Sequence, residues 1–290
     1  MANLKELRSK IHGIQSIRKV TSAMQLVAGV KLKKAERQAL ASKSYAEELW
    51  KMLAEIDRDN LEKRYELFDG RFPVKTETVI VFASDKGFCG SFNYTISKQV
   101  LEIVKNRSKS SIDVKILCAG MKVFSILKHN IEKPHSIELL DGFFQGGTLF
   151  ANAKKLAGRV IDEFNSNEID KTSLLYTCYQ SASRTGIAES TLIPLPPQKR
   201  TDKTRTVFEP DADRLLSYLL PYNLGIQIYQ AALESTASEQ SARMTAMDNS
   251  TRNAADMLAD LTIKYNRTRQ YGITQELTEV VSGAEAISNK

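Results

Sequence analysis

The sequence has 290 residues, of which 42% are hydrophobic and 26% are charged, and its formal net charge is +7. This composition excludes an intrinsically disordered chain and is typical of a folded protein with one sizeable domain and an additional element. No run of eighteen uncharged apolar residues predicts a transmembrane helix, and the start MANLKELRSK resembles neither a signal peptide nor a transit peptide. We therefore expect an intracellular protein that does not span a membrane.

The few cysteines and histidines predict neither a disulfide framework nor a metal site. The cysteines are widely separated and odd in number, which suits small buried side chains. The histidines stand in different contexts and show no ligand spacing. These residues are Cys89, Cys118, Cys178, His12, His129 and His135.

Residues 1–57 predict one long helix. Apolar residues recur in steps of three and four, and the first proline of the chain is Pro73. This apolar stripe consists of Leu4, Leu7, Ile11, Ile14, Ile17, Val20, Met24 and Val27. At ~1.5 Å per residue, a helix from about Asn3 to about Ile56 is roughly 80 Å long, which exceeds the width of a globular domain. It is also basic, because residues 1–45 hold ten Lys or Arg residues against two Glu residues.

Residues 75–195 predict a central Rossmann-like α/β domain with a largely parallel sheet. The segments TVIVFA, IDVKILC, TSLLYTCYQ and ESTLIPL read as strands. Helical patterns cover YTISKQVLEIVKNR, MKVFSILKH and TLFANAKKLAGRVIDEF. Strands that alternate with helices favour this fold class.

Residues 210–290 predict a second long helical segment. We expect a short helix, ADRLLSYLL, that ends at Pro221, and a new helix that begins there, because proline is tolerated at a first helical position. A heptad then runs through Ala237, Gln240, Met244, Met247, Thr251, Ala254, Leu258, Leu261 and Tyr265, and resumes at Ile273, Leu277, Val280, Ala284 and Ile287. This spacing predicts a long left-handed coiled coil, with the N-terminal helix as its antiparallel partner. An arm for oligomerisation is the alternative interpretation.

The loop SDKGFCGSFN is the best candidate for chemistry, because it lies between a predicted strand and a predicted helix. A phosphate could bind there on backbone amides near Gly87 and Gly90. The loop matches neither GxGxxG nor GxxxxGK[ST], and no acidic residue ends the following strand to hold a ribose. Ser84, Asp85 and Cys89 have no histidine nearby in sequence. The sequence therefore favours a tight structural turn and predicts no catalysis.

The basic N-terminal helix allows four interpretations: a solvated face, nucleic acid, a membrane surface or an acidic protein partner. The helix lacks the interleaved aromatic residues typical of nucleic-acid binding. Its stripe also lacks the Trp and Phe residues of an interfacial membrane helix. A solvated face and an acidic protein partner remain.

Both ends of the chain resemble the gamma subunit of F-type ATP synthases. The segment LRSKIHGIQSIRKVTSAMQLVAGVKLKKAE is similar to the opening helix of that family. The segment SEQSARMTAMDNSTRNAADMLADLTIKYNRTRQYGITQELTEVVSGAEA is similar to its signature helix. SDKGFCGSFN resembles the family's loop of serine, aspartate, a basic residue and glycine. The resemblance covers essentially the whole chain.

The resemblance implies a non-catalytic rotor shaft without a cofactor. The two terminal helices would stand inside a hexamer of alpha and beta subunits, and the α/β domain would form a foot that holds the epsilon subunit near the membrane c-ring. Turning of the shaft would couple proton translocation to ATP synthesis or hydrolysis at the beta subunits and regulate the ATPase. The resemblance also implies one copy per complex, no homo-oligomer, no nucleic acid, and a peripheral location on the cytoplasmic face of a bacterial inner membrane.

The resemblance also assigns contact residues. Contacts with the beta subunit are expected from Arg269, Gln270, Thr274 and Glu276, with Met24 and Lys19 opposite them on the N-terminal helix. The hexamer bearing would comprise Val280, Val281, Ala284 and Ile287, and the membrane-ring contact Phe208 and Glu209. A turning shaft should bury little apolar surface in any single orientation, because each Å² would add ~25 cal/mol to a rotational barrier. We therefore expect Asn249, Arg252, Asn253, Asp256 and Asp260 to point outward.

Overall fold

The computed structural model describes residues 2–56, 65–131, 136–145, 148–181, 184–195 and 211–288. The chain divides into two compact units. One contains residues 1–28 and 244–290, and the other contains residues 29–243. Helices α1 (Ala2–Glu55) and α6 (Ala212–Ser288) contribute residues to both units. The domain bounds expected from the sequence, 1–57, 75–195 and 210–290, stay a prediction, since residues 57 and 210 lie outside the described part.

The larger unit is built on a five-stranded sheet with the order β3-β2-β1-β4-β5. Its strands are β1 (Thr76–Phe82), β2 (Asp113–Ala119), β3 (Ile137–Leu139), β4 (Lys171–Ser181) and β5 (Arg184–Ile193). The first four strands are parallel, and β5 pairs antiparallel with β4. This confirms the α/β prediction, although the short strand β3 was not expected, because three residues carry too little periodicity to detect.

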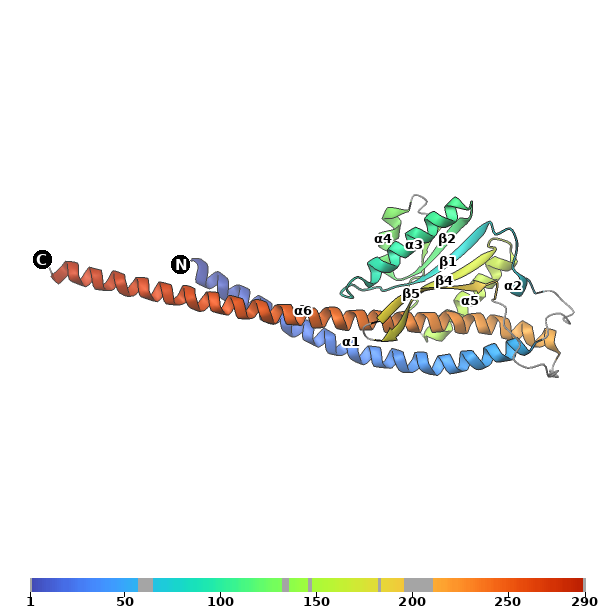
Figure 1. The fold of residues 1–290 in the computed structure, drawn as a ribbon, viewed down its shortest axis with the longest axis horizontal. Coiled ribbons are helices and arrows are strands. Elements are labelled where there is room, and N and C mark those ends of the chain that lie inside the picture. Colours follow the sequence, from blue (N-terminus) through green and yellow to red (C-terminus); the bar gives the residue numbers. More distant parts are fainter. Residues whose placement is uncertain are drawn as a thin grey trace. The chain divides into compact units, whose positions relative to one another are not determined.

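Both faces of the sheet are covered (Figure 1). Alternate residues of β1 serve different cores, because successive strand side chains point to opposite faces. Val79 and Val81 pack with α3 (Phe92–Lys109) and α4 (Met121–Asn130). Ile80 and Phe82 belong to the core that includes α5 (Leu149–Asn165), the end of α1 and the start of α6. The one-turn helix α2 (Glu66–Asp69) contributes Phe68 to that second core.

Helices α1 and α6 run antiparallel within each unit. In the larger unit, the Tyr45 and Tyr222 rings meet edge to face, with centroids 6.2 Å apart. In the smaller unit, Thr251 Oγ1 donates to Thr21 Oγ1 over 2.8 Å. Gln25 Nε2 donates to Asp248 Oδ1 over 3.0 Å. The contact partner on α6 thus moves from residue 251 to residue 248 as the contact on α1 moves from residue 21 to residue 25, which shows that the helices are antiparallel. The terminal helices therefore pair as predicted.

The buried face of α1 differs from the predicted stripe. Ile17, Val20 and Val27 are more than half exposed, while Thr21 and Ala28 are buried. The contact row follows a seven-residue spacing that includes Leu7, Ile14, Thr21 and Ala28. The predicted stripe followed apolar residues and is one position out of step with the buried residues after Ile14. The buried position there is Thr21, whose hydroxyl forms a hydrogen bond with Thr251 of α6.

Helix α6 is continuous through Pro221, so the predicted helix end and restart at this residue are wrong. Proline has no N–H, and the hydrogen bond that it would make to the preceding turn is lost. Pro221 is exposed, and Leu220 and Leu224 beside it are buried in the core. Burial of these neighbours offsets the lost hydrogen bond and keeps both segments in one helix.

Candidate functional site

The loop after β1 lies at the carboxyl edge of the parallel strands, where open α/β sheets usually bind ligands. Its own side chains stabilise it. The Ser84 N–H donates to Asn93 Oδ1 over 3.1 Å, and Ser84 Oγ donates to the Lys86 carbonyl over 2.5 Å. Phe88 and Gly90 both have positive φ angles, of 63° and 59°. These contacts favour the interpretation of the loop as a tight structural turn.

Helix α6 occupies the same edge with polar side chains. Ser235 Oγ donates to the carbonyl of Phe82, the last residue of β1, over 3.2 Å. Ser238 Oγ donates to the Thr177 carbonyl of β4 over 2.9 Å. Arg243 Nη2 donates to the Gly87 carbonyl over 3.3 Å and to Ser84 Oγ over 3.4 Å. At the sheet edge where other α/β proteins bind a ligand, backbone carbonyls of this chain instead accept hydrogen bonds from its own helix α6.

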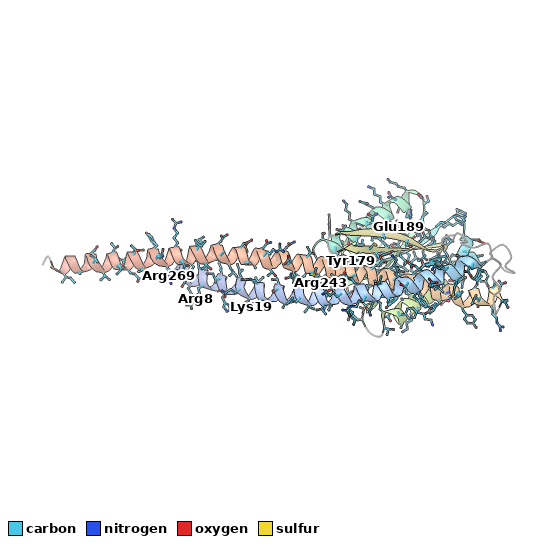
Figure 2. The ribbon with its side chains drawn as sticks, turned by 60° about the horizontal axis from the view of Figure 1, so that its bottom comes forward. Arg8, Lys19, Tyr179, Glu189, Arg243 and Arg269 are labelled. Atoms are coloured by element: carbon cyan, nitrogen blue, oxygen red, sulfur yellow. The ribbon has the colours of Figure 1, made fainter. Side chains whose placement is uncertain are left out.

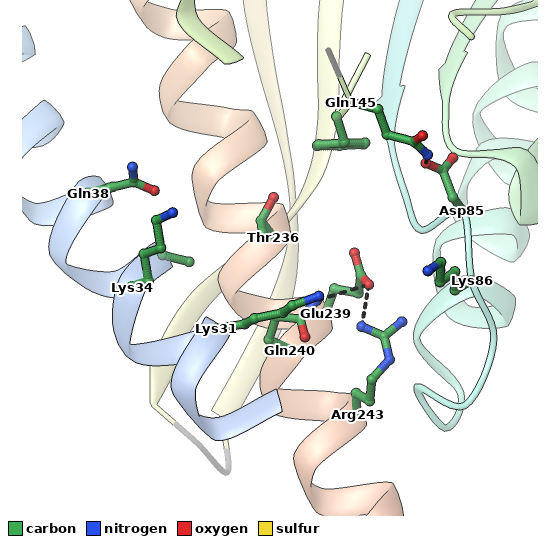
Figure 3. Close-up of a pocket in the computed structure, with 12 residues that line it drawn as sticks. Lys31, Lys34, Gln38, Asp85, Lys86, Gln145, Thr236, Glu239, Gln240 and Arg243 are labelled. Carbon is green, nitrogen blue, oxygen red and sulfur yellow. Dashed lines mark hydrogen bonds and ion pairs between the residues drawn. The ribbon is translucent and has the colours of Figure 1, made fainter. Parts of the chain in front are cut away.

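A pocket of about 400 Å³ adjoins these contacts (Figure 3). It contains cations from α1 and from the loop, among them Lys31, Lys34 and Lys86. Its two carboxylates are already engaged. Asp85 accepts from the Met121 N–H over 3.1 Å, and Glu239 forms a 2.5 Å ion pair with Arg243. Burial raises the pKa of Glu239, and the neighbouring Arg243 opposes that rise.

The three cysteines are free thiols. Cys89 and Cys118 are buried, as predicted, whereas Cys178 is only partly buried. Burial raises the pKa of Cys118 to about 12 and that of Cys178 to about 11. Thiols with such pKa values stay protonated at neutral pH, and the thiolate is the reactive form. Within the described ranges, no group of three or more metal-ligating side chains gathers.

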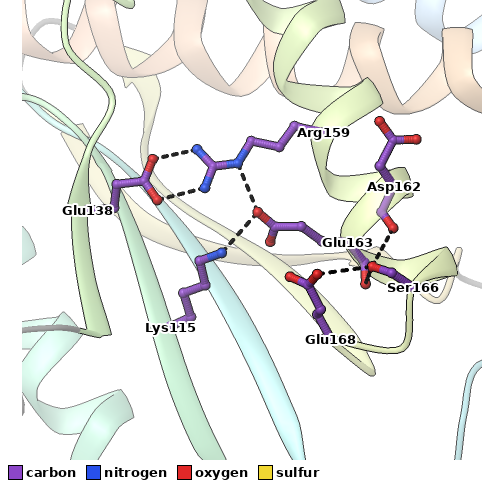
Figure 4. Close-up of polar contacts among 7 residues, drawn as sticks. All are labelled: Lys115, Glu138, Arg159, Asp162, Glu163, Ser166 and Glu168. Carbon is purple, nitrogen blue, oxygen red and sulfur yellow. Dashed lines mark hydrogen bonds and ion pairs between the residues drawn. The ribbon is translucent and has the colours of Figure 1, made fainter.

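A second polar cluster joins α5 to the sheet (Figure 4). Arg159 binds both carboxylate oxygens of Glu138, over 2.5 and 2.6 Å, and donates to Glu163 over 2.8 Å. Lys115 of β2 reaches the same Glu163 oxygen over 2.9 Å. The hydrogen bond from Arg159 lowers the pKa of Glu138. Lys115, Glu138, Arg159 and Glu163 each have a partner of opposite sign, so these ion pairs hold the helix against the sheet.

In the smaller unit, the predicted contact residues are accessible. Lys19 lines a groove of about 730 Å³ between α1 and α6, together with Arg18, Leu26 and Thr251. Figure 2 shows Lys19 and Arg269 among the side chains of these helices. Gln270, Thr274 and Glu276 are also exposed, as are Asn249, Arg252, Asn253, Asp256 and Asp260, and Met24 is half-buried. Phe208 and Glu209 lie outside the described residues.

The structure does not place Met24 and Lys19 opposite Arg269. The pairing of Thr21 with Thr251 sets Lys19 level with about residue 253. Arg269 lies about sixteen residues further, or roughly 25 Å along the helix axis. These residues therefore form two separate surfaces, which the sequence did not reveal because it fixes no register between the helices.

The end of α6 has no partner within this chain over the described residues. The same register sets Ala2 level with about residue 270. Val280, Val281 and Ile287 beyond it are 70%, 55% and 79% exposed, and Ala284 is exposed too. An apolar helix end of this kind is typical of a contact surface for another protein.

Sequence reasoning missed Ser235, Ser238, Glu239 and Arg243. A signal was present, because small polar residues cluster in a segment where the helix must be buried. Their spacing of three and four places them on one face. The heptad prediction began at Ala237 and treated this stretch only as coiled coil.

This arrangement defines a class of protein that combines a mixed α/β domain with an antiparallel pair of terminal helices. A family model described as ATP synthase matches residues 3–287. The chain is 37% identical to the ATP synthase gamma chain of Paramagnetospirillum magneticum, over 99% of this chain and 100% of that protein. It is 38% identical to the gamma chain of Gluconobacter oxydans, with the same coverage of both chains. The protein belongs to the ATP synthase gamma chain family.

The fold also resembles a solved structure. The rotor of the Euglena gracilis mitochondrial ATP synthase aligns with a TM-score of 0.66 at 14% identity, over 94% of this chain and 99% of that chain. At this level of identity the likeness concerns the fold. No helix in the described part of the chain is long and apolar enough to cross a membrane.

Proposed function

We propose that this chain is the central rotor shaft of an F-type ATP synthase. It couples proton translocation through a membrane c-ring to ATP synthesis or hydrolysis at beta subunits, and it regulates ATPase activity without a catalytic site of its own. The observation that carries this proposal is the antiparallel pairing of α1 with α6. The C-terminal end of α6 extends beyond α1 and exposes Val280, Val281 and Ile287. Family membership supports it.

The partners follow from the same assignment. Alpha and beta subunits would surround the paired helices, and the larger unit would contact the c-ring and an epsilon subunit. The basic character of residues 1–45 suits acidic loops of a beta subunit. The complex would hold one copy of this chain, peripheral to the cytoplasmic face of a bacterial inner membrane. Phe208 and Glu209 remain our candidates for the ring contact, and Val280, Val281, Ala284 and Ile287 for the bearing.

Reconstitution tests this function. The purified chain is mixed with alpha and beta subunits, and ATPase activity and subunit ratio are measured. We expect activity with one copy of this chain per complex, and none from the chain alone. A stable homo-oligomer in sedimentation, with no binding to the other subunits, would instead support the alternative of an oligomerisation arm.

The beta contacts have their own test. A partly desolvated arginine that pairs with a carboxylate contributes about 1.5–3 kcal/mol, enough to bias orientations without locking them. We expect Arg269→Ala combined with Gln270→Ala to impair coupled ATP synthesis. Arg267→Ala combined with Thr268→Ala removes the same charge on another face of the same turn and serves as the control. Wild-type synthesis from the first variant would reject those contacts.

A further inference from the structure

Tyr45 of α1 and Tyr222 of α6 lie against each other in the larger unit. Their rings meet edge to face, with centroids 6.2 Å apart. The Tyr45 hydroxyl donates to the Tyr222 hydroxyl over 3.4 Å, which is long for a hydrogen bond between two hydroxyl groups. Among the ring contacts of the described residues, this is the one that joins two tyrosines. The hydroxyl ends of two phenols from different helices are thus brought together.

The two rings differ in how firmly they are held. Phe150 of α5 packs edge to face against Tyr222, with centroids 5.9 Å apart, and against Tyr229, with centroids 5.6 Å apart. Tyr222 therefore belongs to a row of aromatic rings that restricts its movement. Tyr45 is 52% exposed, and exposed side chains change rotamer within nanoseconds. A small oxidant can reach Tyr45, and the Tyr45 ring can turn against Tyr222.

Two phenols in contact can be joined by oxidation. The hydrogen bond with Tyr45 and burial raise the pKa of Tyr222, so this hydroxyl is protonated at neutral pH. Removal of one electron and the hydroxyl proton from each tyrosine gives two phenoxyl radicals. The unpaired electron of such a radical is shared with the Cε atoms, the ring carbons beside the one that carries the oxygen. One Cε atom of each ring can then form a carbon–carbon bond, which gives dityrosine.

We propose that Tyr45 and Tyr222 are a site of oxidative cross-linking, at which a dityrosine bond ties α1 to α6 and stabilises the larger unit. Hydrogen peroxide, activated by a haem peroxidase, is the oxidant. The two hydrogen atoms removed from the hydroxyl groups pass to peroxide, which becomes two molecules of water. After the bond forms, the hydrogen on each coupled Cε atom moves to the neighbouring oxygen and restores the hydroxyl group.

This chemistry needs only the paired helices, so it holds whether or not the chain acts as a rotor. The bond would connect residues that are 177 positions apart in the sequence. A cross-link over so long a segment restricts the unfolded chain more than a short one does. The folded chain changes little, because the two rings are already in contact. We therefore expect the bond to stabilise the folded state.

The test treats the full chain with hydrogen peroxide and a haem peroxidase at low protein concentration. The monomer is separated on a denaturing gel, and its peptides are analysed by mass spectrometry. We expect a linked pair of peptides that contains Tyr45 and Tyr222 and lacks the two hydrogen atoms passed to peroxide. Tyr45→Phe and Tyr222→Phe should each lose this species, because phenylalanine keeps the packed ring but has no hydroxyl group.

Tyr218→Phe is the matched control. Tyr218 lies one turn before Tyr222 in α6 and is 73% exposed, so accessibility alone would favour it over Tyr45 as the coupling partner. We expect this variant to form the link between Tyr45 and Tyr222 as the wild type does. A link from Tyr218 in place of Tyr45 would overturn the site. Absence of the Tyr45 and Tyr222 peptide pair from the oxidised wild type would overturn it too.

Urea unfolding tests the stabilising role. The oxidised wild type should contain a fraction that unfolds at a higher urea concentration than the untreated protein. Oxidised Tyr45→Phe should show no such fraction, and it also corrects for oxidation of other side chains. Equal midpoints for the linked wild type and oxidised Tyr45→Phe would mean that the bond strains the folded state as much as it restricts the unfolded one, and would overturn the stabilising role.

Discussion

Glu77 is an ionised side chain that folding removes completely from solvent. It accepts from Ser173 Oγ over 2.6 Å, Arg107 Nε over 2.7 Å and Lys171 Nζ over 3.0 Å. Burial by itself raises the pKa of this carboxyl group, but the hydrogen bonds from Ser173 and Lys171 and the charges of Lys171 and Arg107 outweigh it. The pKa therefore lies below its ordinary value of 4.5. The folded state therefore favours the charged form of Glu77.

We expect Glu77→Gln to lower the free energy of unfolding by about 2 kcal/mol at neutral pH, because charged hydrogen bonds are lost in a buried site. Urea unfolding is followed by fluorescence of Trp50, the only tryptophan, which packs against the core of the larger unit. Glu48→Gln is the control, because Glu48 and its ion-pair partner Lys51 are 70% and 63% exposed. We expect it to change the free energy of unfolding by less than about 0.5 kcal/mol.

Glu77→Gln should also change how the free energy of unfolding depends on pH. A carboxyl group whose pKa is lowered by folding stabilises the protein above its unfolded-state pKa, and this stability is lost as the pH falls through the folded-state value. The wild type should therefore lose its advantage over Glu77→Gln as the pH falls below 4.5. A constant difference down to the lowest measurable pH would contradict this assignment.

Gly120 is required where β2 leads into α4. Its φ angle is 145°, and an added Cβ would meet the Ala83 carbonyl carbon at 2.7 Å. We expect Gly120→Ala to cost at least about 2 kcal/mol, through backbone strain and a clash with main-chain atoms. Gly158 in α5 has no atom within 4 Å of a built Cβ, so Gly158→Ala should add about 0.5–1 kcal/mol. Equal urea midpoints for the two variants would refute this distinction.

At the scale of elements, α6 accommodates a proline that its packing does not require. We expect Pro221→Ala to raise the free energy of unfolding by about 1–2 kcal/mol, since a helical hydrogen bond is gained and part of that gain is offset by a more flexible unfolded chain. Urea unfolding measures the change, with Arg214→Ala, on the exposed surface about two turns earlier in the helix, as the control. A lower midpoint for Pro221→Ala would contradict this expectation and show that the proline stabilises the folded protein.

Elements with strong periodicity were predictable from sequence, as was the antiparallel pairing of the terminal helices, but the register of that pairing was not. The pattern of β1 predicts its strand, because six of its seven residues are buried. The ends of α1 and α6 were also close to their predicted positions, apart from the restart at Pro221. The face of α1 was mispredicted after Ile14, because Thr21 and Gln25 gain their place only from Thr251 and Asp248 on the other helix. The role of Arg243 depends on the fold in the same way, since its loop partners lie more than 150 residues away.

At the scale of the whole molecule, the two units differ in how much of their structure is supported within the chain. Residues beyond about 270 of α6 lie past the end of α1. An isolated helix of this length without packing is only marginally stable in water. We expect amides of residues 273–288 to exchange hydrogen rapidly in the free chain and to become protected after assembly with alpha and beta subunits. Amides of residues 225–241 should be protected in both states and serve as the internal reference.

Equal exchange of residues 273–288 before and after assembly would reject the proposed bearing at Val280, Val281, Ala284 and Ile287. Protection without assembly would indicate that the free chain self-associates through this end. The measurement thus separates the rotor function from the oligomerisation arm by a property of the backbone alone.

The serine and arginine contacts of α6 at the carboxyl edge of the sheet have a pharmacological consequence. A small molecule that bound at this edge would compete with helix α6, which is part of the same polypeptide. A covalent tether gives its occupant an effective concentration on the order of millimolar or more, which no dilution of the protein lowers. Any inhibitor designed for the usual ligand position of this fold would first have to displace that tethered helix.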